Sequence, residues 1–146
     1  MMTLRRLVHL VETQSEALAL QLVDKVRQSE MTPDYRNVPE EELRDRVYEI
    51  YRHLGDWLLA NDEQQVERRY LRIGRERATQ RVPFSQVAWV IVFTKENLWD
   101  LLERQTAAEH PEGGYGELEL LKLLNRFFDR AICYASVGYE QHMSAN

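Results

Sequence analysis

Residues 83–102, with the sequence PFSQVAWVIVFTKENLWDLL, decide the fold. At about 100° per residue, most of their apolar side chains fall on one stripe of a helix. The members of this stripe are Phe84, Val87, Ala88, Ile91, Leu98, Trp99 and Leu102. A second apolar patch on the other side consists of Trp89, Val90 and Phe93. A helix with two apolar faces lies in the centre of a bundle or contacts a partner chain, and the two alternatives are compatible.

The segments on either side show the same helical period, interrupted at a few defined points. Pro33 and Pro39 disfavour helix just before them, Asn61 and Asp62 end the next helix, and residues 113–116 contain three glycines. Asp62 and Gln65 have the spacing of a capping box at a helix start. The pattern predicts one all-α domain over residues 1–146, a bundle of five main helices. Their expected ranges are 4–30, 39–60, 62–80, 84–108 and a long C-terminal helix over 117–142.

The composition is that of a folded domain, since 44% of the 146 residues are hydrophobic and 29% are charged. The formal net charge of −5 argues against nucleic-acid binding, which needs a basic surface. The longest apolar run, residues 87–93, is far shorter than the ~20 residues of a membrane span, and the N-terminus does not resemble a signal peptide. Because Cys133 is the single cysteine, no internal disulfide can form, and we expect a cytoplasmic location.

Three residues are candidates for binding a ligand: Lys95, Trp99 and Trp57. Lys95 lies near the centre of the apolar stripe of residues 84–102, where a cation needs an acceptor or must reach solvent. That acceptor is either a carboxylate on a facing helix, with Asp56 and Glu49 as candidates, or the anionic head group of a ligand. The alternative for the two tryptophans is a place in the hydrophobic core.

A homodimer interface is the second expectation. The segment 117–142 is apolar over about half of its circumference, and the segment 84–108 carries the second apolar patch. We therefore assign Trp89, Val90, Phe93 and Phe127 to an interface between two copies of the chain. A buried pair of helices within one compact bundle explains the same pattern.

Charged and metal-binding side chains give weaker signals. Arg68, Arg72 and Arg75 share one face of the segment 62–80, which indicates a solvated face with ion pairs or a docking surface for an acidic partner. His53 lies on the flank of its helix, where a haem ligand could stand, but we expect no haem, no other cofactor and no metal. The chain contains no Glu-x-x-His pair, CxxC motif, phosphate-binding loop or Gly-x-Ser-x-Gly motif, so we expect no enzyme activity.

Three stretches together resemble a known family: residues 33–58 (PDYRNVPEEELRDRVYEIYRHLGDWL), residues 67–102 (ERRYLRIGRERATQRVPFSQVAWVIVFTKENLWDLL) and residues 123–141 (LLNRFFDRAICYASVGYEQ). They resemble the RsbRD-type N-terminal sensory domain of RsbT co-antagonist proteins, which act in stressosome signalling. The same domain precedes some bacterial sensor histidine kinases. The matched features are Tyr35, residues 75–78 ahead of Val82-Pro83, Leu98-Trp99, and residues 127–131.

The resemblance implies a globin-like helical sensor without haem, because related N-terminal domains are similar to globins. It implies a non-enzymatic sensory or regulatory module of bacterial signal transduction, which passes a ligand- or partner-induced change through its C-terminal helix. Its partner is a downstream signalling protein or an output domain, which family members carry after that helix. The alternative function is a globin-like protein that binds haem or another small ligand.

Overall fold

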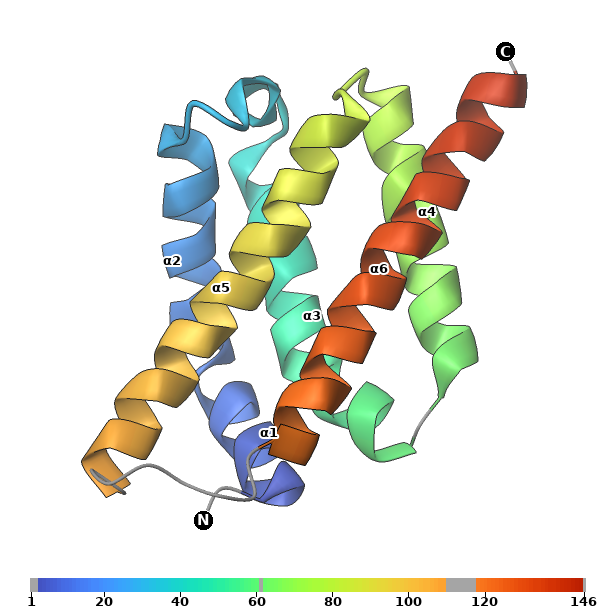
Figure 1. Ribbon diagram of the computed structural model, residues 1–146. Coiled ribbons are helices and arrows are strands. Elements are labelled where there is room, and N and C mark those ends of the chain that lie inside the picture. Colours follow the sequence, from blue (N-terminus) through green and yellow to red (C-terminus); the bar gives the residue numbers. More distant parts are fainter. Residues whose placement is uncertain (1–2, 61, 110–117, 146) are drawn as a thin grey trace.

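The computed structural model describes residues 3–60, 62–109 and 118–145, and every regular element in these ranges is helical (Figure 1). The elements are α1 (Leu4–Thr13), α2 (Ser15–Gln28), a short 3₁₀ helix η1 (Pro33–Asn37), α3 (Glu40–Ala60), α4 (Glu63–Thr79), α5 (Phe84–Glu109) and α6 (Leu118–Ala145). The fold class is therefore all-α, as expected. None of the helices in the described ranges has the length and apolar character needed to cross a membrane.

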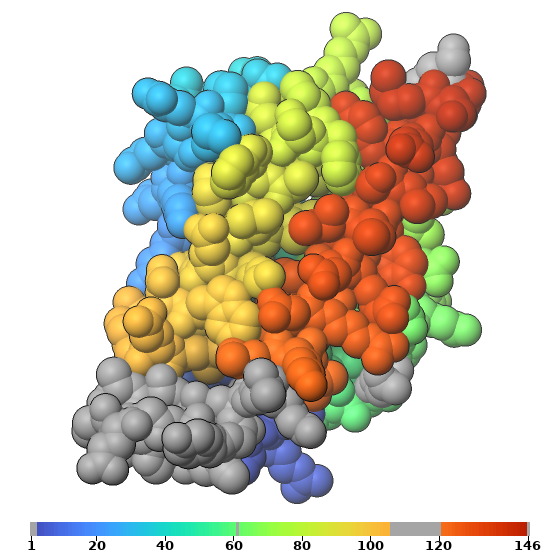
Figure 2. Space-filling view, in the orientation of Figure 1, coloured from blue at the N-terminus to red at the C-terminus, as the bar shows by residue number. Residues whose placement is uncertain are grey.

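The helices form a bundle in which α6 packs mainly against α4, and α3 packs against α1 and α2. Figure 1 shows α5 and α6 next to each other, with α3 behind them. In the space-filling view of Figure 2, α5 (yellow to orange) and α6 (orange to red) form most of one face, with α2 (blue) at one edge and α4 (green) at the other.

The first expected helix, over residues 4–30, is two helices, so the described part of the chain contains six α-helices instead of the five predicted. The break lies at Gln14, whose backbone angles (φ −100°, ψ 6°) leave the helical range. Next to it, the hydroxyl of Ser15 donates a hydrogen bond to the Glu12 carbonyl at 2.8 Å, and the Thr13 hydroxyl donates to Leu10 at 3.0 Å. Such local hydrogen bonds compete with helix continuation, and the apolar stripe alone does not show them.

The other predicted helices are present with shifted ends. The capping position before α4 is confirmed, because the Asp62 side chain accepts a hydrogen bond from the Gln65 N–H at 3.2 Å. The long C-terminal helix extends to Ala145 instead of ending near His142. The glycine turn at 113–116 and the expected helix start at Glu117 lie outside the described residues.

Helix α5 packs against α2, α4 and α6 while its outer side lies on the surface, and these contacts cover most of its two apolar faces. Val90 and Phe93 of the second patch are buried, and the Lys25 ammonium of α2 lies 4.7 Å from the centre of the Phe93 ring. Phe127 of α6 is buried as well. Three of the four assigned interface residues thus pack within the chain itself, whereas Trp89 remains 38% exposed.

Helices α4 and α6 touch backbone to backbone at two glycines. A Cβ atom on Gly74 would lie 2.1 Å from the carbonyl oxygen of Ala135, and one on Gly138 would lie 2.1 Å from the carbonyl oxygen of Leu71. No side chain fits at either position without separating the helices. The turn after α4 is fixed to α6 too, since the Tyr139 hydroxyl donates to the Val82 carbonyl at 2.7 Å. α4 and α6 therefore behave as one packed pair.

Candidate functional site

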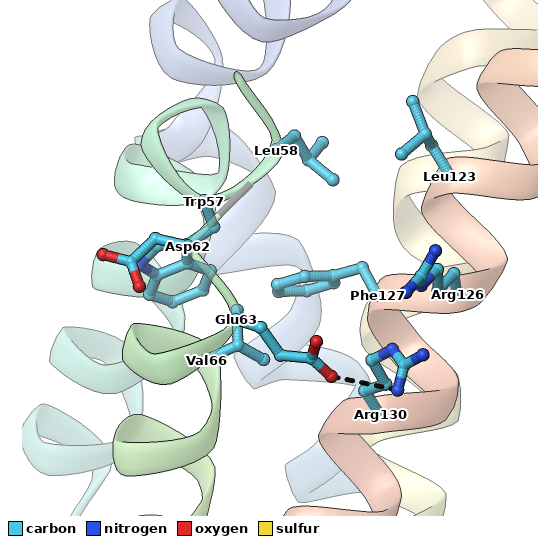
Figure 3. A pocket seen from close by; sticks show the side chains of 9 residues that line it. All are labelled: Trp57, Leu58, Asp62, Glu63, Val66, Leu123, Arg126, Phe127 and Arg130. Atoms are coloured by element: carbon cyan, nitrogen blue, oxygen red, sulfur yellow. Dashed lines mark ion pairs between the residues drawn. The ribbon is translucent and has the colours of Figure 1, made fainter. Parts of the chain in front are cut away.

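The candidate site is a pocket between the α3–α4 corner and α6 (Figure 3). Its volume is about 50 Å³, enough for a small molecule of a few heavy atoms at its open edge. The lining residues come from both sides of the pocket: Trp57, Leu58, Asp62, Glu63, Val66, Leu123, Arg126, Phe127 and Arg130. We call it the α6 pocket.

Aromatic rings form the inner wall of the α6 pocket. The rings of Trp57 and Phe127 stack with centroids 5.4 Å apart, and Figure 3 shows Phe127 reaching from α6 towards the α3–α4 corner. Tyr70 of α4 packs edge-on against both, at 6.4 Å from Trp57 and 6.0 Å from Phe127. Offset and edge-to-face pairs of this kind add about 0.5–1.5 kcal/mol beyond burial, so the cluster ties α3, α4 and α6 together.

A polar rim crosses from α4 to α6 at the edge of the pocket. The Glu63 carboxylate pairs with the Arg130 guanidinium at 3.0 Å, as the dashed line in Figure 3 marks, and accepts a hydrogen bond from the Tyr134 hydroxyl at 2.9 Å. The hydrogen bond to Glu63 raises the pKa of the Tyr134 hydroxyl, because ionisation would remove the proton that Tyr134 donates to the carboxylate. The Arg130 Nε is buried and has no hydrogen-bond partner among the described residues. Two carboxylates, those of Asp62 and Glu63, and two guanidinium groups, those of Arg126 and Arg130, line the pocket. Arg126 has no carboxylate partner in the part of the chain that the structure describes, so its guanidinium and the unpartnered Nε of Arg130, beside the apolar wall, suit a small carboxylate with an apolar body.

A second, larger concavity lies between α3 and α4. Its volume is about 650 Å³, it is open to solvent, and it shares Trp57 with the α6 pocket. Its lining residues are His53, Asp56, Trp57, Gln65, Arg68, Arg69, Arg72 and Arg75. We call it the arginine groove.

The position of His53 does not favour haem binding. The side chain is 50% exposed, its Nδ1 lies 3.4 Å from the Asp56 carboxylate, and it lines the arginine groove. A haem-ligating histidine needs an apolar cavity around the porphyrin, and the surroundings of His53 are charged.

The three candidate ligand residues do not lie together. Trp57 lines both concavities, whereas Lys95 and Trp99 stand one turn apart on α5, half-buried, and are not among the residues lining the α6 pocket. A ligand-binding role of Lys95 and Trp99 stays a prediction.

The ion pair expected for Lys95 is wrong for both candidate carboxylates. Glu49 pairs with Arg69 and also lies 3.7 Å from Arg46, and Asp56 lies against His53. Glu49 therefore pairs with arginines at the contact between α3 and α4. The helix period had predicted only that its carboxylate could face Lys95 on α5.

Sequence reasoning missed the polar rim of the α6 pocket. Arg126, Arg130 and Tyr134 recur every four residues on one side of α6, next to Phe127, and this spacing was the available signal. Glu63, the partner of Arg130 and Tyr134, lies at the start of α4, where an acidic residue also suits the helix N-terminus. Because Glu63 and Arg130 are 67 residues apart in the chain, no local sequence pattern indicates that they pair.

The described residues form a helical bundle whose long last helix lines a surface pocket. The chain belongs to the family of the RsbT co-antagonist protein rsbRD N-terminal domain, whose model matches residues 16–145, covering nearly all of α2 through α6. It is thus a regulatory domain of the signal-transduction type, and the resemblance noted in the sequence is confirmed. Comparison with curated proteins and with solved structures finds no match.

Proposed function

We propose that this domain is a non-enzymatic sensory module whose α6 pocket takes a small ligand and whose α6 helix transmits the resulting change. The observation that carries the proposal is the position of Phe127 and Arg130, which line the pocket and belong to the C-terminal helix. A ligand that separates Phe127 from Trp57, or Arg130 from Glu63, acts directly on α6. Because α4 contacts α6 through backbone atoms at Gly74 and Gly138, the two helices respond as a pair.

The family supports the direction of this transmission. RsbT co-antagonist domains are regulatory, and the resemblance of the sequence implies that the last helix leads to an output domain. We place the module in the cytoplasm, acting on a downstream signalling protein or an output domain of stressosome type. A globin-like arrangement stays a prediction, and haem binding is the less favoured alternative because of the charged surroundings of His53.

The ligand proposal predicts stabilisation by small carboxylates. Acetate, propionate and isobutyrate are suitable probes, since each combines one carboxylate with a small apolar body. At a concentration about 100 times its Kd, a bound probe stabilises the folded chain by ~2.7 kcal/mol. For a chain of this length, we expect a rise in melting temperature of roughly 5–10 °C.

The same titration should change the fluorescence of Trp57 and should fail in Arg130→Met. Arg104→Met, which removes an exposed arginine of α5 outside the pocket, is the matched control and should keep the full shift. An equal shift in Arg130→Met and wild type would place the probe elsewhere. Absence of any shift for all three probes at saturating concentration would remove the small carboxylate as the ligand class.

We also propose that the domain forms a homodimer through α5 and α6. Large apolar side chains remain exposed on both helices, namely Trp89, Leu123, Val137 and Met143. Single apolar residues on a surface are ordinary, but four on two neighbouring helices favour association.

The dimer prediction is tested best at Trp89. Trp89→Glu is expected to give a monomer in light scattering. Because the Trp89 side chain is partly exposed, the variant should stay folded, with a melting temperature within a few degrees of that of the wild-type chain at low concentration. Phe93→Glu and Phe127→Glu serve as contrasts, since both bury a charge inside the chain and should unfold it. A wild-type chain that is monomeric in light scattering at high concentration contradicts the proposal.

A further inference from the structure

We propose that the arginine groove is a docking site for an acidic helical segment of a partner protein. The groove shares Trp57 with the α6 pocket and otherwise has different lining residues, and the inference does not depend on a ligand in that pocket. It begins with charge: four arginines of α4 line the groove, and Asp56 is the single carboxylate among the lining residues. The chain as a whole carries a net charge of −5, so this surface has the opposite sign from the rest of the domain.

Two of the four guanidinium groups have no carboxylate partner within the described residues. The Nε of Arg68 donates to the Gln64 carbonyl at 3.4 Å, and an Nη of Arg75 donates to the side-chain oxygen of Gln141 at 2.6 Å. The other two are engaged: Arg69 pairs with Glu49, and Arg72 lies 3.8 Å from Glu76. The positive charge of Arg68 and Arg75 is therefore available to a partner, while Arg69 is held in place.

The spacing of the arginines matches a helix better than a small molecule. Arg68, Arg72 and Arg75 occupy positions i, i+4 and i+7, which spread three guanidinium groups over about 10 Å on one face of α4. A partner helix with acidic residues at the same spacing can present one carboxylate to each. Arginine suits this role, because its planar fork binds a carboxylate with two hydrogen bonds.

The openness of the groove also favours a polypeptide segment over a small molecule. It is an open trough between α3 and α4 with a volume of about 650 Å³, whereas a small-molecule site encloses most of its ligand. At its inner side the Arg69 guanidinium lies 5.6 Å from the centre of the Trp57 ring, a cation–π contact that keeps both side chains ordered. An open, charged concavity whose arginines follow one another along α4 fits a segment of polypeptide laid along that helix.

The test uses the full chain and a synthetic probe. The probe is a fluorescently labelled, alanine-rich peptide of about 20 residues, long enough to be helical in isolation, with glutamates at i, i+4 and i+7. Fluorescence anisotropy at low ionic strength should show saturable binding that weakens as salt is added. Arg68→Glu and Arg75→Glu are each expected to raise the Kd of the peptide at least about tenfold, the effect of losing and then reversing one charge-assisted contact.

Matched controls distinguish binding in the groove from nonspecific electrostatic attraction between the peptide and the protein. Arg44→Glu makes the same charge change at an exposed position of α3 outside the groove and should leave the Kd within about twofold, as for other distant surface charges. A peptide with the same number of glutamates placed around the helix should bind more weakly. Equal binding of that peptide, or equal weakening by Arg44→Glu, would overturn the proposal.

Inorganic tripolyphosphate is the competing small anion. If it binds more tightly than the peptide and is lost in Arg68→Glu, the groove is a small-anion site and the proposal is wrong. The groove variants also separate this inference from the proposed function. Arg68→Glu and Arg75→Glu should keep the carboxylate-induced melting shift of the α6 pocket, and Arg130→Met should keep the binding of the acidic peptide.

Discussion

Replacing Gly138 by alanine is expected to destabilise the chain by about 3 kcal/mol, although helix propensity alone favours alanine by ~1 kcal/mol. The added Cβ would lie 2.1 Å from the Leu71 carbonyl oxygen and 2.8 Å from the Leu71 carbonyl carbon. Both obstacles are backbone atoms in the middle of α4, so no side-chain rotation relieves the overlap. The helices must separate, and the contact between α4 and α6 loosens along its length. Urea unfolding followed by circular dichroism measures the loss.

Gly55→Ala is the matched control for this substitution. It adds the same methyl group inside a helix, but its nearest neighbours are side-chain atoms, Val8 Cγ1 at 2.1 Å and Glu12 Oε1 at 2.6 Å. Side chains can change rotamer, so we expect a smaller cost than at Gly138. If Gly138→Ala costs no more than Gly55→Ala, the backbone contact between α4 and α6 is not the rigid feature that the transmission proposal requires.

Removing the partner of Arg77 is expected to have the second large effect. The Arg77 side chain is only 3% exposed, and its guanidinium donates to the Glu42 carboxylate at 3.1 Å and to the side-chain oxygen of Gln80 at 2.7 Å. It also lies 5.5 Å from the centre of the Tyr35 ring. Burial raises the pKa of the Tyr35 hydroxyl to about 12, against a smaller opposing effect of Arg77. One cation therefore connects η1, the first turn of α3 and the end of α4.

Glu42→Leu should cost about 3 kcal/mol, because it leaves a buried guanidinium without its counter-charge. Arg77→Met should cost less, since the methionine leaves no buried charge and Glu42, 32% exposed, can turn to solvent. The double variant should recover most of the loss caused by Glu42→Leu. Glu41→Leu, at an exposed neighbouring position, is the control and should be nearly neutral. Urea unfolding of the four variants and wild type measures the free energy of unfolding of each. If the loss in the double variant equals the sum of the losses in Glu42→Leu and Arg77→Met, the two residues are not coupled and the prediction is wrong.

The helix period predicted most of the fold, because each stripe is decided by residues close in sequence. It assigned α3, α4, α5 and the end of α4 at the Arg81–Pro83 break, and the Asp62–Gln65 spacing located a helix start correctly. It missed the break at Gln14, where hydroxyl groups of Thr13 and Ser15 bond to carbonyls within one turn. Apolar spacing continues across such a break, so the period alone cannot reveal it.

The candidate site was harder to predict from the sequence than the fold, because its polar contacts join residues far apart in the chain. Trp57 was identified from the sequence, but Glu63, Arg130 and Tyr134 were not, and their pairing depends on how α4 and α6 cross. The same limit applies to Glu49, which was expected near Lys95 and pairs with Arg69. Helix packing decides which carboxylate pairs with a given cation. The spacing in the sequence specifies only the helix face on which each charged side chain lies.

Trp57 connects the two proposed binding sites. Its indole lines the α6 pocket and the arginine groove at once, with the Phe127 ring on one side and the Arg69 cation near its face. Two molecules that contact the same ring do not bind independently when either one displaces it. By thermodynamic reciprocity, the factor by which the first changes the affinity of the second equals the factor in the reverse direction. If both proposals hold, a ligand that pushed the indole towards the groove would weaken the binding of the docked segment, and the docked segment would weaken the binding of the ligand by the same factor.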